Sequence, residues 1–310
     1  MADDVPNRVR TACAWVAGRS RSVKIAGDGI EAYAAALPVP AELPAPDPAT
    51  HLVEGDREAR AAFVVCLDAI NFGSGWWPTI RKRPGHSGYF TIAAGLTERF
   101  REEGPWPARE LTRLGPPDVA AALDQEAGHP LMAHYASALR DVGEHVLGDH
   151  GGRFEGLLDA AGGSAVALTG LLAEWEAFAD VSTYDDRAVP FFKRAQIAAA
   201  DLNRTGVAEL GGEDRLTAFA DNLVPHVLRL DGVLRLDSEL ERSIDAGELL
   251  EHGSPEEVEL RACAVHAIEL LSAATGGRLS PAQIDAALWN RGAEPRYKSV
   301  PRPRSRNTAY

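Results

Sequence analysis

Two basic side chains lie in the middle of a segment that is otherwise apolar on almost every side. The segment covers residues 187–203, RAVPFFKRAQIAAADLN, and the basic pair is Lys193 and Arg194. This composition predicts one buried helix. A buried cation is costly unless it meets an opposite charge or a ligand. Either residue could pair with one of the many carboxylates of the chain. Either could also lie at the floor of a pocket and bind a phosphate or an active-site carboxylate.

An aspartate borders the apolar stripe of a second predicted helix, residues 215–230. Asp221 precedes Pro225 by four residues. Because proline cannot donate a hydrogen bond to the carbonyl of residue 221, we expect the helix to loosen or kink there. A carboxylate beside such a break has the chemistry of a catalytic acid or base. It is equally suited to cap a new helix that starts at Pro225, and both interpretations remain open.

A glycine-rich turn with an amide and three aromatic residues follows a predicted helix over residues 56–70. The sequence of residues 68–78 is DAINFGSGWWP, which includes Asn71 and Phe72. Aromatic faces beside an amide suit the recognition of a planar heterocycle. The same side chains would also fill the core at the end of a helix, so this pattern does not decide between the two roles.

A histidine-based metal site is a further interpretation, because His145 and Asp149 share a predicted helix face and His150 follows them. Such a site would support a metal-dependent phosphohydrolase. The adjacent His-Asp pair of that class does not occur in the sequence, and neither does a glycine-rich loop of the Walker A or dinucleotide type. We therefore predict no cofactor and no bound metal.

Helices must position these residues, because helical periodicity recurs and period-two alternation is nearly absent. Helices are predicted near residues 5–18, 27–37, 56–70, 88–102, 130–147, 164–178, 187–203, 215–230 and 234–246. Two more are predicted to begin at Ser254 and Ser280, each an N-cap followed by proline and then by an acid or amide. The prediction is an all-α fold, in which residues 23–25 are the only strand-like piece.

Proline-rich stretches at residues 38–48 and 104–117 could separate parts of the fold. The expected boundaries are a single all-α catalytic domain over residues 1–310, with two possible lobes at about 1–105 and 106–290 and a basic tail at 291–310.

The charge of the chain is unevenly distributed. The 310 residues carry a net charge of −13, and the last twenty carry six basic side chains against one acid, or +5, so the preceding 290 carry −18. An acidic body disfavours general binding of duplex DNA or of anionic membranes, although a local basic cluster could hold a small anion. The three cysteines are far apart, and neither a signal peptide nor a membrane-spanning run is evident. We expect a reduced, cytoplasmic protein.

The sequence resembles the queuosine salvage protein family in the string Phe191-Phe192-Lys193-Arg194-Ala195-Gln196-Ile197, in Ala200-Asp201, and in Phe219-Ala220-Asp221 with Pro225. The resemblance runs from about residue 50 onward. Supporting pieces follow the same order: Asn71-Phe72, Ser164-Ala165, Phe178-x-Asp180 with Tyr184, Glu259-Leu260-Arg261-Ala262, and the basic tail to Tyr310.

The resemblance implies an enzyme that cleaves queuosine 5′-monophosphate between the ribose and the 7-deazaguanine base, releasing queuine for tRNA queuosine salvage. It also implies a helical fold similar to helical DNA glycosylases, with Asp221 as the catalytic carboxylate and Lys193 opposite it. The residues expected near the substrate are Asn71, Phe72, Asp180, Tyr184 and Arg194. Arg194 competes with Lys193 and the tail for the 5′-phosphate.

This chemistry suits the residues available. A carboxylate stabilises an oxocarbenium-like ribosyl centre. Because 7-deazaguanine lacks N7, assistance to the leaving base must come from other contacts, for which Asn71 or Asp180 are candidates. An acidic pocket would favour the secondary ammonium of the base. The predicted partner is a small nucleotide, without a stable nucleic-acid complex or a membrane, and the oligomeric state stays open. The alternative is a non-catalytic protein that binds modified nucleotides or tRNA.

Overall fold

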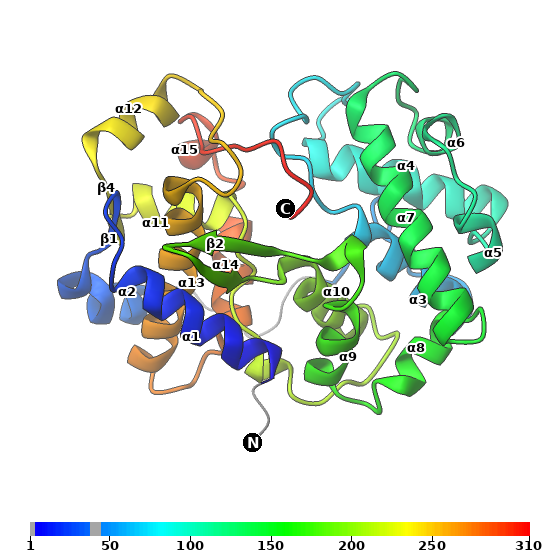
Figure 1. Cartoon of the computed structure of the whole chain (residues 1–310), viewed down its shortest axis with the longest axis horizontal. Coiled ribbons are helices and arrows are strands. Elements are labelled where there is room, and N and C mark those ends of the chain that lie inside the picture. The colour runs from blue at the N-terminus through cyan, green and yellow to red at the C-terminus, as the bar shows by residue number, and fades with distance from the viewer. Residues whose placement is uncertain (1–3, 38–44) are drawn as a thin grey trace.

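The computed structural model describes residues 4–37 and 45–310 and is mostly helical (Figure 1). The predicted all-α class is confirmed in this main feature, since fifteen α-helices lie in these ranges. They are α1 (Val5–Ala17), α2 (Ile30–Ala36), α3 (Arg57–Ala69), α4 (Gly88–Glu103), α5 (Ala108–Leu111), α6 (Pro116–Ala122), α7 (Pro130–Asp149), α8 (Phe154–Ala160), α9 (Ala165–Leu172), α10 (Lys193–Arg204), α11 (Leu223–Leu230), α12 (Ser238–Asp245), α13 (Pro255–Ala274), α14 (Pro281–Arg291) and α15 (Pro295–Lys298). Most of the proline-rich stretch at 38–48 lies outside the described residues.

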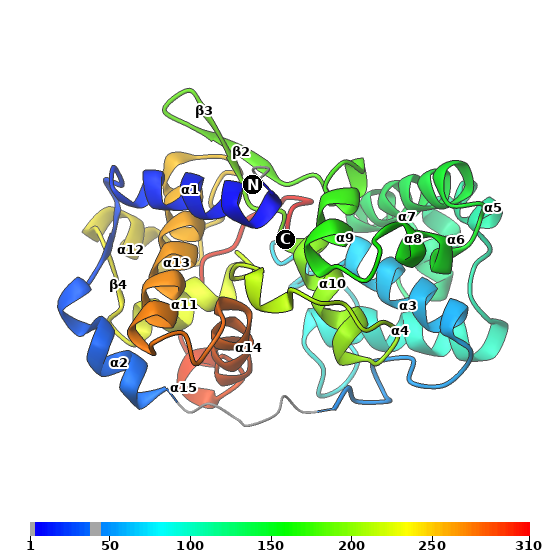
Figure 2. The ribbon, with the colours of Figure 1, turned by 90° about the horizontal axis from the view of Figure 1, so that it is seen from below.

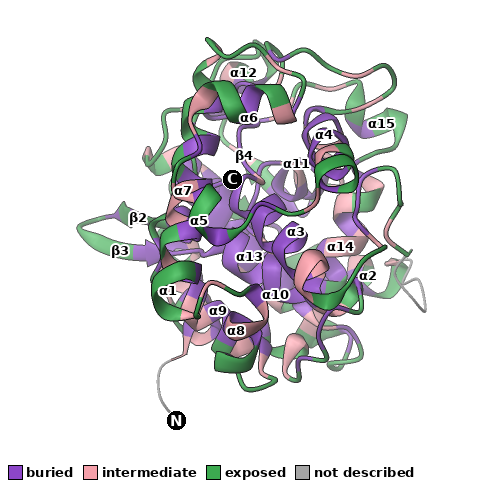
Figure 3. Ribbon diagram, turned by 90° about the vertical axis from the view of Figure 1, so that its right-hand side faces the viewer, coloured by how far each residue is buried: buried purple, intermediate pink, exposed green. Residues whose placement is uncertain are grey.

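The helices form two groups that face each other, as Figures 1 and 2 show from two directions. Helices α3 to α10 make up one group, in which α3 contacts α7 and α10. Helices α1, α2 and α11 to α15 make up the other group, where α13 contacts α1, α2 and α14. Figure 3 shows α10 and α13 as mainly buried. Buried apolar side chains of both groups belong to one core cluster, so the two groups share a packed interior.

Four short strands form two antiparallel pairs. The strand-like piece of the sequence is β1 (Val23–Ile25), and its partner is β4 (Leu234–Leu236). The helix predicted from residue 234 is therefore wrong in its first turn, because these residues pair with a segment more than 200 positions away. The helix of this region, α12, starts only after Asp237, whose carboxylate caps it.

The second pair corrects the predicted helix over residues 187–203. Strands β2 (Val181–Tyr184) and β3 (Arg187–Pro190) form a hairpin whose two turn residues, Asp185 and Asp186, have positive φ angles of 43° and 60°. Such a turn matches the twist of paired strands. Residues 187–190 therefore belong to the hairpin. The helix begins at Lys193, directly after Phe192, whose backbone lies in the left-handed region with φ 48°.

The predicted helix over 215–230 is also shorter than expected. The helix α11 begins at Leu223, and residues 217–221 before it are not helical. Pro225 lies in the first turn, where backbone N–H groups have no partner inside the helix, so its missing donor costs little. The caps predicted at Ser254 and Ser280 are confirmed, since each hydroxyl accepts a hydrogen bond from the third helical residue. In the described ranges, no helix has the length and hydropathy to cross a bilayer.

Candidate active site

Lys193 and Asp221 are buried and come from opposite groups of helices. Lys193 opens α10 and Asp221 directly precedes α11, and their exposed fractions are 5% and 9%. Burial has the largest influence on both groups: it lowers the pKa of Lys193 to about 8 and raises the pKa of Asp221 above its usual range. Each charge partly offsets the shift of the other, which indicates that the two side chains lie near each other.

Asp221 caps the helix that follows it. Its Oδ1 atom accepts hydrogen bonds from the backbone N–H groups of Leu223 at 2.8 Å and Val224 at 2.9 Å. The capping interpretation is confirmed in that Asp221 binds the first two N–H groups of the helix, although the N-cap position is held by Asn222 and the helix starts at Leu223 rather than at Pro225. Within the described residues, these bonds use Oδ1 alone. One carboxylate can therefore cap the helix and keep its second oxygen for a ligand.

Asn71, predicted from the sequence, does lie beside Lys193. The Lys193 ammonium donates to the backbone carbonyl of Asn71 at 3.0 Å, with its side-chain oxygen at 3.5 Å. The amide of Asn71 in turn donates to Asp68 Oδ1 at 3.3 Å. Asp68 is fully buried, and its Oδ2 atom has no partner among the described residues. Burial and the nearby Asp201 carboxylate raise the pKa of Asp68 well above its usual range.

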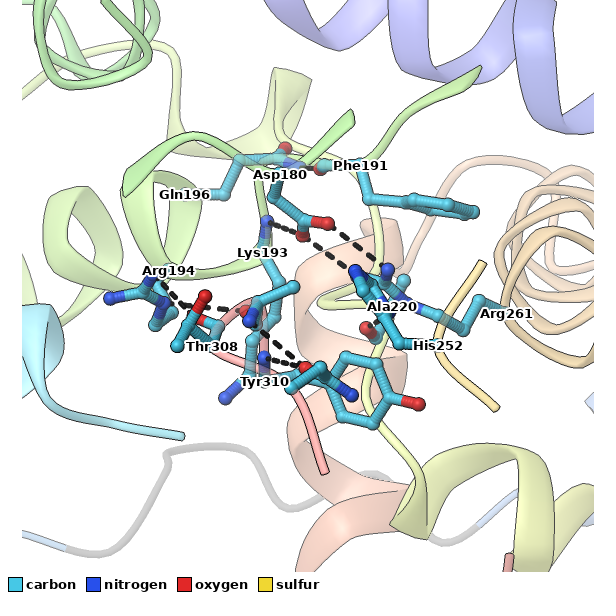
Figure 4. A network of polar contacts seen from close by, with 12 residues as sticks. Asp180, Phe191, Lys193, Arg194, Gln196, Ala220, His252, Arg261, Thr308 and Tyr310 are labelled. Atoms are coloured by element: carbon cyan, nitrogen blue, oxygen red, sulfur yellow. Dashed lines mark hydrogen bonds and ion pairs between the residues drawn. The ribbon is translucent and has the colours of Figure 1, made fainter. Parts of the chain in front are cut away.

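Asp180 forms a buried ion pair with Arg261 that connects the backbone of Lys193 to the carbonyl of Ala220 (Figure 4). The two Arg261–Asp180 hydrogen bonds measure 3.0 and 2.7 Å, and both side chains are 1% exposed. Asp180 also accepts the backbone N–H of Lys193 at 3.1 Å. Arg261 donates to the carbonyl of Ala220, next to Asp221, at 3.0 Å. Both carboxylate oxygens are thus engaged in holding the backbone on either side of the site.

Arg194 binds backbone carbonyls in this structure. Its guanidinium donates to the carbonyls of Ala69, of Thr308 at 2.6 Å and of Ala309 at 3.3 Å (Figure 4). The guanidinium carbon lies 4.9 Å from the centre of the Phe72 ring. Arg194 therefore ties the end of α3 to the C-terminal segment, and its donors face main-chain oxygens instead of a free space.

The other two residues predicted near the substrate, Phe72 and Tyr184, make contacts inside the protein. Phe72 is 1% exposed, packs edge-on against Tyr135 at 5.0 Å, and its carbonyl accepts the Tyr135 hydroxyl. Tyr184 donates to Glu259 at 2.6 Å. Glu259 also accepts the backbone N–H groups that lead into β1. The structure does not bring Tyr184 into a hydrogen bond with Lys193 or Asp221.

Some residues near the site could not be identified from the sequence patterns. Asp285 of α14 accepts the N–H of Phe219 at 3.0 Å, and the charge of Asp221 adds to the burial that raises the pKa of Asp285. One turn further, Trp289 packs edge-on against Tyr89 and Phe90 of α4, at 6.1 and 6.0 Å between ring centres. The four-residue spacing of Asp285 and Trp289 is the signal that could have marked a shared helix face.

The histidines of the metal interpretation lie elsewhere. His145 binds Asp149 at 2.8 Å and stacks on Trp175 at 4.8 Å between ring centres. Across the described ranges, no group of three or more His, Cys, Asp or Glu side chains is arranged to hold a metal ion. Two cavities of about 260 and 480 Å³ are lined by other residues, among them Arg57 for the first and Arg83 for the second. Neither cavity includes Lys193 or Asp221.

Comparison with known proteins gives a consistent set of relatives. A family model described as queuosine salvage protein matches residues 50–310. A queuosine 5′-phosphate N-glycosylase/hydrolase of Sphaerobacter thermophilus is 36% identical over 266 residues, covering 82% of each chain. The protein of the same name from Mus musculus is 27% identical and covers 98% of this chain and 99% of its own. The one from Dictyostelium discoideum is 25% identical, with 97% and 98% covered.

Proposed function

The chain belongs to the queuosine salvage protein family, and from this premise we propose that it hydrolyses the N-glycosidic bond of queuosine 5′-monophosphate and releases queuine. The observation that carries the proposal is the buried Asp221 carboxylate close to the Lys193 ammonium. A carboxylate in a water-poor site interacts strongly with a developing positive charge. The cleavage of a ribosyl bond develops such a charge at C1′.

In the proposed reaction, the bond between C1′ and the base nitrogen breaks, and its electron pair leaves with the base. Asp221 stabilises the ribosyl cation and accepts a proton from the water that adds to C1′. The base nitrogen takes up a proton, so the products are queuine and ribose 5-phosphate. Lys193 opposes the effect of burial on Asp221 and so favours the ionised carboxylate that this role needs.

Recognition of the base falls to residues at the end of α3 and on α4, α10 and α14. Both oxygens of Asp180 are engaged by Arg261 and Lys193, so assistance to the leaving base passes to Asn71, with Asp68 behind it. The nearby Asp201 carboxylate supplies negative charge for the secondary ammonium of the base, while the raised pKa of Asp68 favours its neutral, protonated form. The aromatic side chains around Trp289 offer faces on which a planar ring could stack.

The direct test is to incubate the protein with queuosine 5′-monophosphate and to measure free queuine by mass spectrometry. Guanosine 5′-monophosphate is the matched control, because it has the same sugar phosphate and lacks the cationic arm. We expect queuine release and little guanine release. Tight binding of the nucleotide without release would instead support the alternative of a non-catalytic binding protein.

The pH profile of kcat/KM should have an alkaline limb near pH 8. Above that pH, Lys193 loses its proton, because burial lowers its pKa to about 8, and its contribution to the positive charge near Asp221 is lost. Activity should therefore fall as the pH rises through 8. Activity should also fall on the acidic side, where Asp221 becomes protonated at a pH above the usual range for aspartate.

Lys193→Met separates the titration of the enzyme from that of the substrate. The variant should have lower activity at pH 7, and its profile should lack the limb near pH 8. Substrate titration would affect both proteins alike. An alkaline limb that is unchanged in Lys193→Met would contradict the assignment.

Two finer features are part of the same proposal. Similarity to helical DNA glycosylases is supported by the helical architecture and by the buried aspartate at a helix start. A cytoplasmic location is supported by three free, buried cysteines, Cys13, Cys66 and Cys263.

A further inference from the structure

The basic C-terminal segment, residues 297–310, crosses between the two groups of helices (Figure 1). Backbone contacts fix its course from end to end. They join the carbonyls of Tyr297 to His226, of Pro301 to Arg229, of Pro303 to Asn222, of Arg304 to Leu250, of Thr308 to Arg194 and of Tyr310 to Gly73. The segment is therefore a built part of the site region, and its side chains have defined positions.

Arg302 is the basic residue that this course brings to Asp221. The carbonyl of Pro303 accepts the Asn222 amide at 2.8 Å, and Asn222 directly follows Asp221. Arg302 itself is half-buried. Burial lowers the pKa of its guanidinium, and the charge of Asp221 opposes that shift, as expected for a cation near the carboxylate.

The guanidinium of Arg302 has no hydrogen bond or ion pair within residues 4–37 and 45–310, unlike the other arginines of the site. Arg194 donates to three carbonyls, and Arg261 binds Asp180 and the Ala220 carbonyl. Lys193 already donates to Asn71. A partly buried cation without a partner is costly, and its five N–H donors are available to an anion.

We propose that Arg302 binds the 5′-phosphate of the nucleotide substrate, an inference that rests on the proposed function. The guanidinium fork matches the oxygens of a phosphate and can bind two of them at once. The phosphate and the C1′ atom belong to one ribose 5-phosphate unit, so a cation close to Asp221 can hold the phosphate while the carboxylate acts at C1′. Arg304, which lies near Arg302, adds to the positive potential there.

The test compares Arg302→Gln with wild type on two substrates, queuosine 5′-monophosphate and the queuosine nucleoside. On the nucleotide, kcat/KM should fall about 10- to 100-fold, the usual range for a lost charged hydrogen bond. On the nucleoside, the two proteins should agree within about threefold, because that substrate has no phosphate to lose. Arg306→Gln is the matched control, since Arg306 is an exposed arginine of the same segment. It should resemble wild type on both substrates.

A second measurement uses ribose 5-phosphate as the probe. Its dissociation constant, measured by calorimetry, should rise in Arg302→Gln and stay unchanged in Arg306→Gln. Equal losses on nucleotide and nucleoside, or unchanged affinity for ribose 5-phosphate, would overturn the phosphate assignment. If wild type releases queuine from neither substrate, the proposed function fails, and the ribose 5-phosphate titration still decides whether Arg302 binds phosphate.

Discussion

An Asp221→Asn variant is expected to lose about 10³-fold or more in kcat for queuine release, while it folds like the wild-type protein. General-base and electrostatic contributions of this kind each amount to about 10²- to 10⁴-fold. The amide of asparagine keeps the shape of the carboxylate and an oxygen that accepts the N–H groups of Leu223 and Val224. It lacks the negative charge that a ribosyl cation needs. The measurement is single-turnover release of queuine, followed by mass spectrometry.

Asp237→Asn is the matched control for this variant. Asp237 also caps a helix, since its Oδ1 atom accepts the N–H groups of Glu239 and Leu240, but that helix is α12, which carries none of the proposed site residues. Both variants should unfold within a few degrees of wild type, and only Asp221→Asn should be inactive. Release at the wild-type rate by Asp221→Asn would exclude a catalytic role for this carboxylate and would leave it with the capping role alone.

Arg261→Met should lower the free energy of unfolding by about 3 to 5 kcal/mol, the usual cost of removing one partner of a buried ion pair. The loss leaves the Ala220 carbonyl without its Arg261 donor and the buried Asp180 carboxylate without its counter-charge, with only the backbone N–H of Lys193 as a donor. The methionine also replaces a guanidinium that lies 3.9 Å from the centre of the Phe191 ring. The melting temperature should fall by about 5 to 15 °C. Thermal and urea unfolding measure the effect.

Arg81→Gln provides the comparison at the surface. Arg81 pairs with Asp124 at 3.1 Å, and both side chains are more than half exposed. Its removal should cost less than about 1 kcal/mol. If Arg261→Met fails to fold, Asp180→Asn gives a second variant, in which the amide can still accept one hydrogen bond from Arg261. Melting temperatures for Arg261→Met and Arg81→Gln that agree within about 2 °C would show that the buried pair does not hold the site together.

The helical skeleton could be predicted from local signals, and its departures come from partners that are remote in sequence. Ser254 and Ser280 mark their helix starts because each cap bonds within four residues. The segment 187–190 looks helical by composition, but its backbone groups pair with the strand 181–184 across a turn of two aspartates. Periodicity describes one segment at a time and cannot anticipate that competition.

The site residues also divide into those that local sequence signals identify and those whose partners are remote in sequence. Lys193 and Asp221 could be singled out because a charge in an apolar segment is unusual wherever the fold places it. Arg194 has the same signal and proves to bind carbonyls from residues more than 100 positions away. Arg302 lies in a basic tail that resembles a solvated end, and only the course of the backbone through Asn222 brings it to Asp221. Residue type identifies the candidates, and topology assigns their roles.

The path of residues 297–310 also has a consequence for synthesis of the protein. Ribosomes release the chain from its N-terminal side, and domains begin to pack as they emerge. Helices α3 to α10 have been synthesised about a hundred residues before Thr308 and Ala309. Arg194 therefore lacks these two carbonyl partners while the rest of its group of helices packs. A nascent chain at that stage has a buried arginine without acceptors on one side. We therefore expect residues 297–310 to insert after helices α3 to α10 have packed, and a chain that lacks these residues should keep a buried Arg194 with only the Ala69 carbonyl as its acceptor.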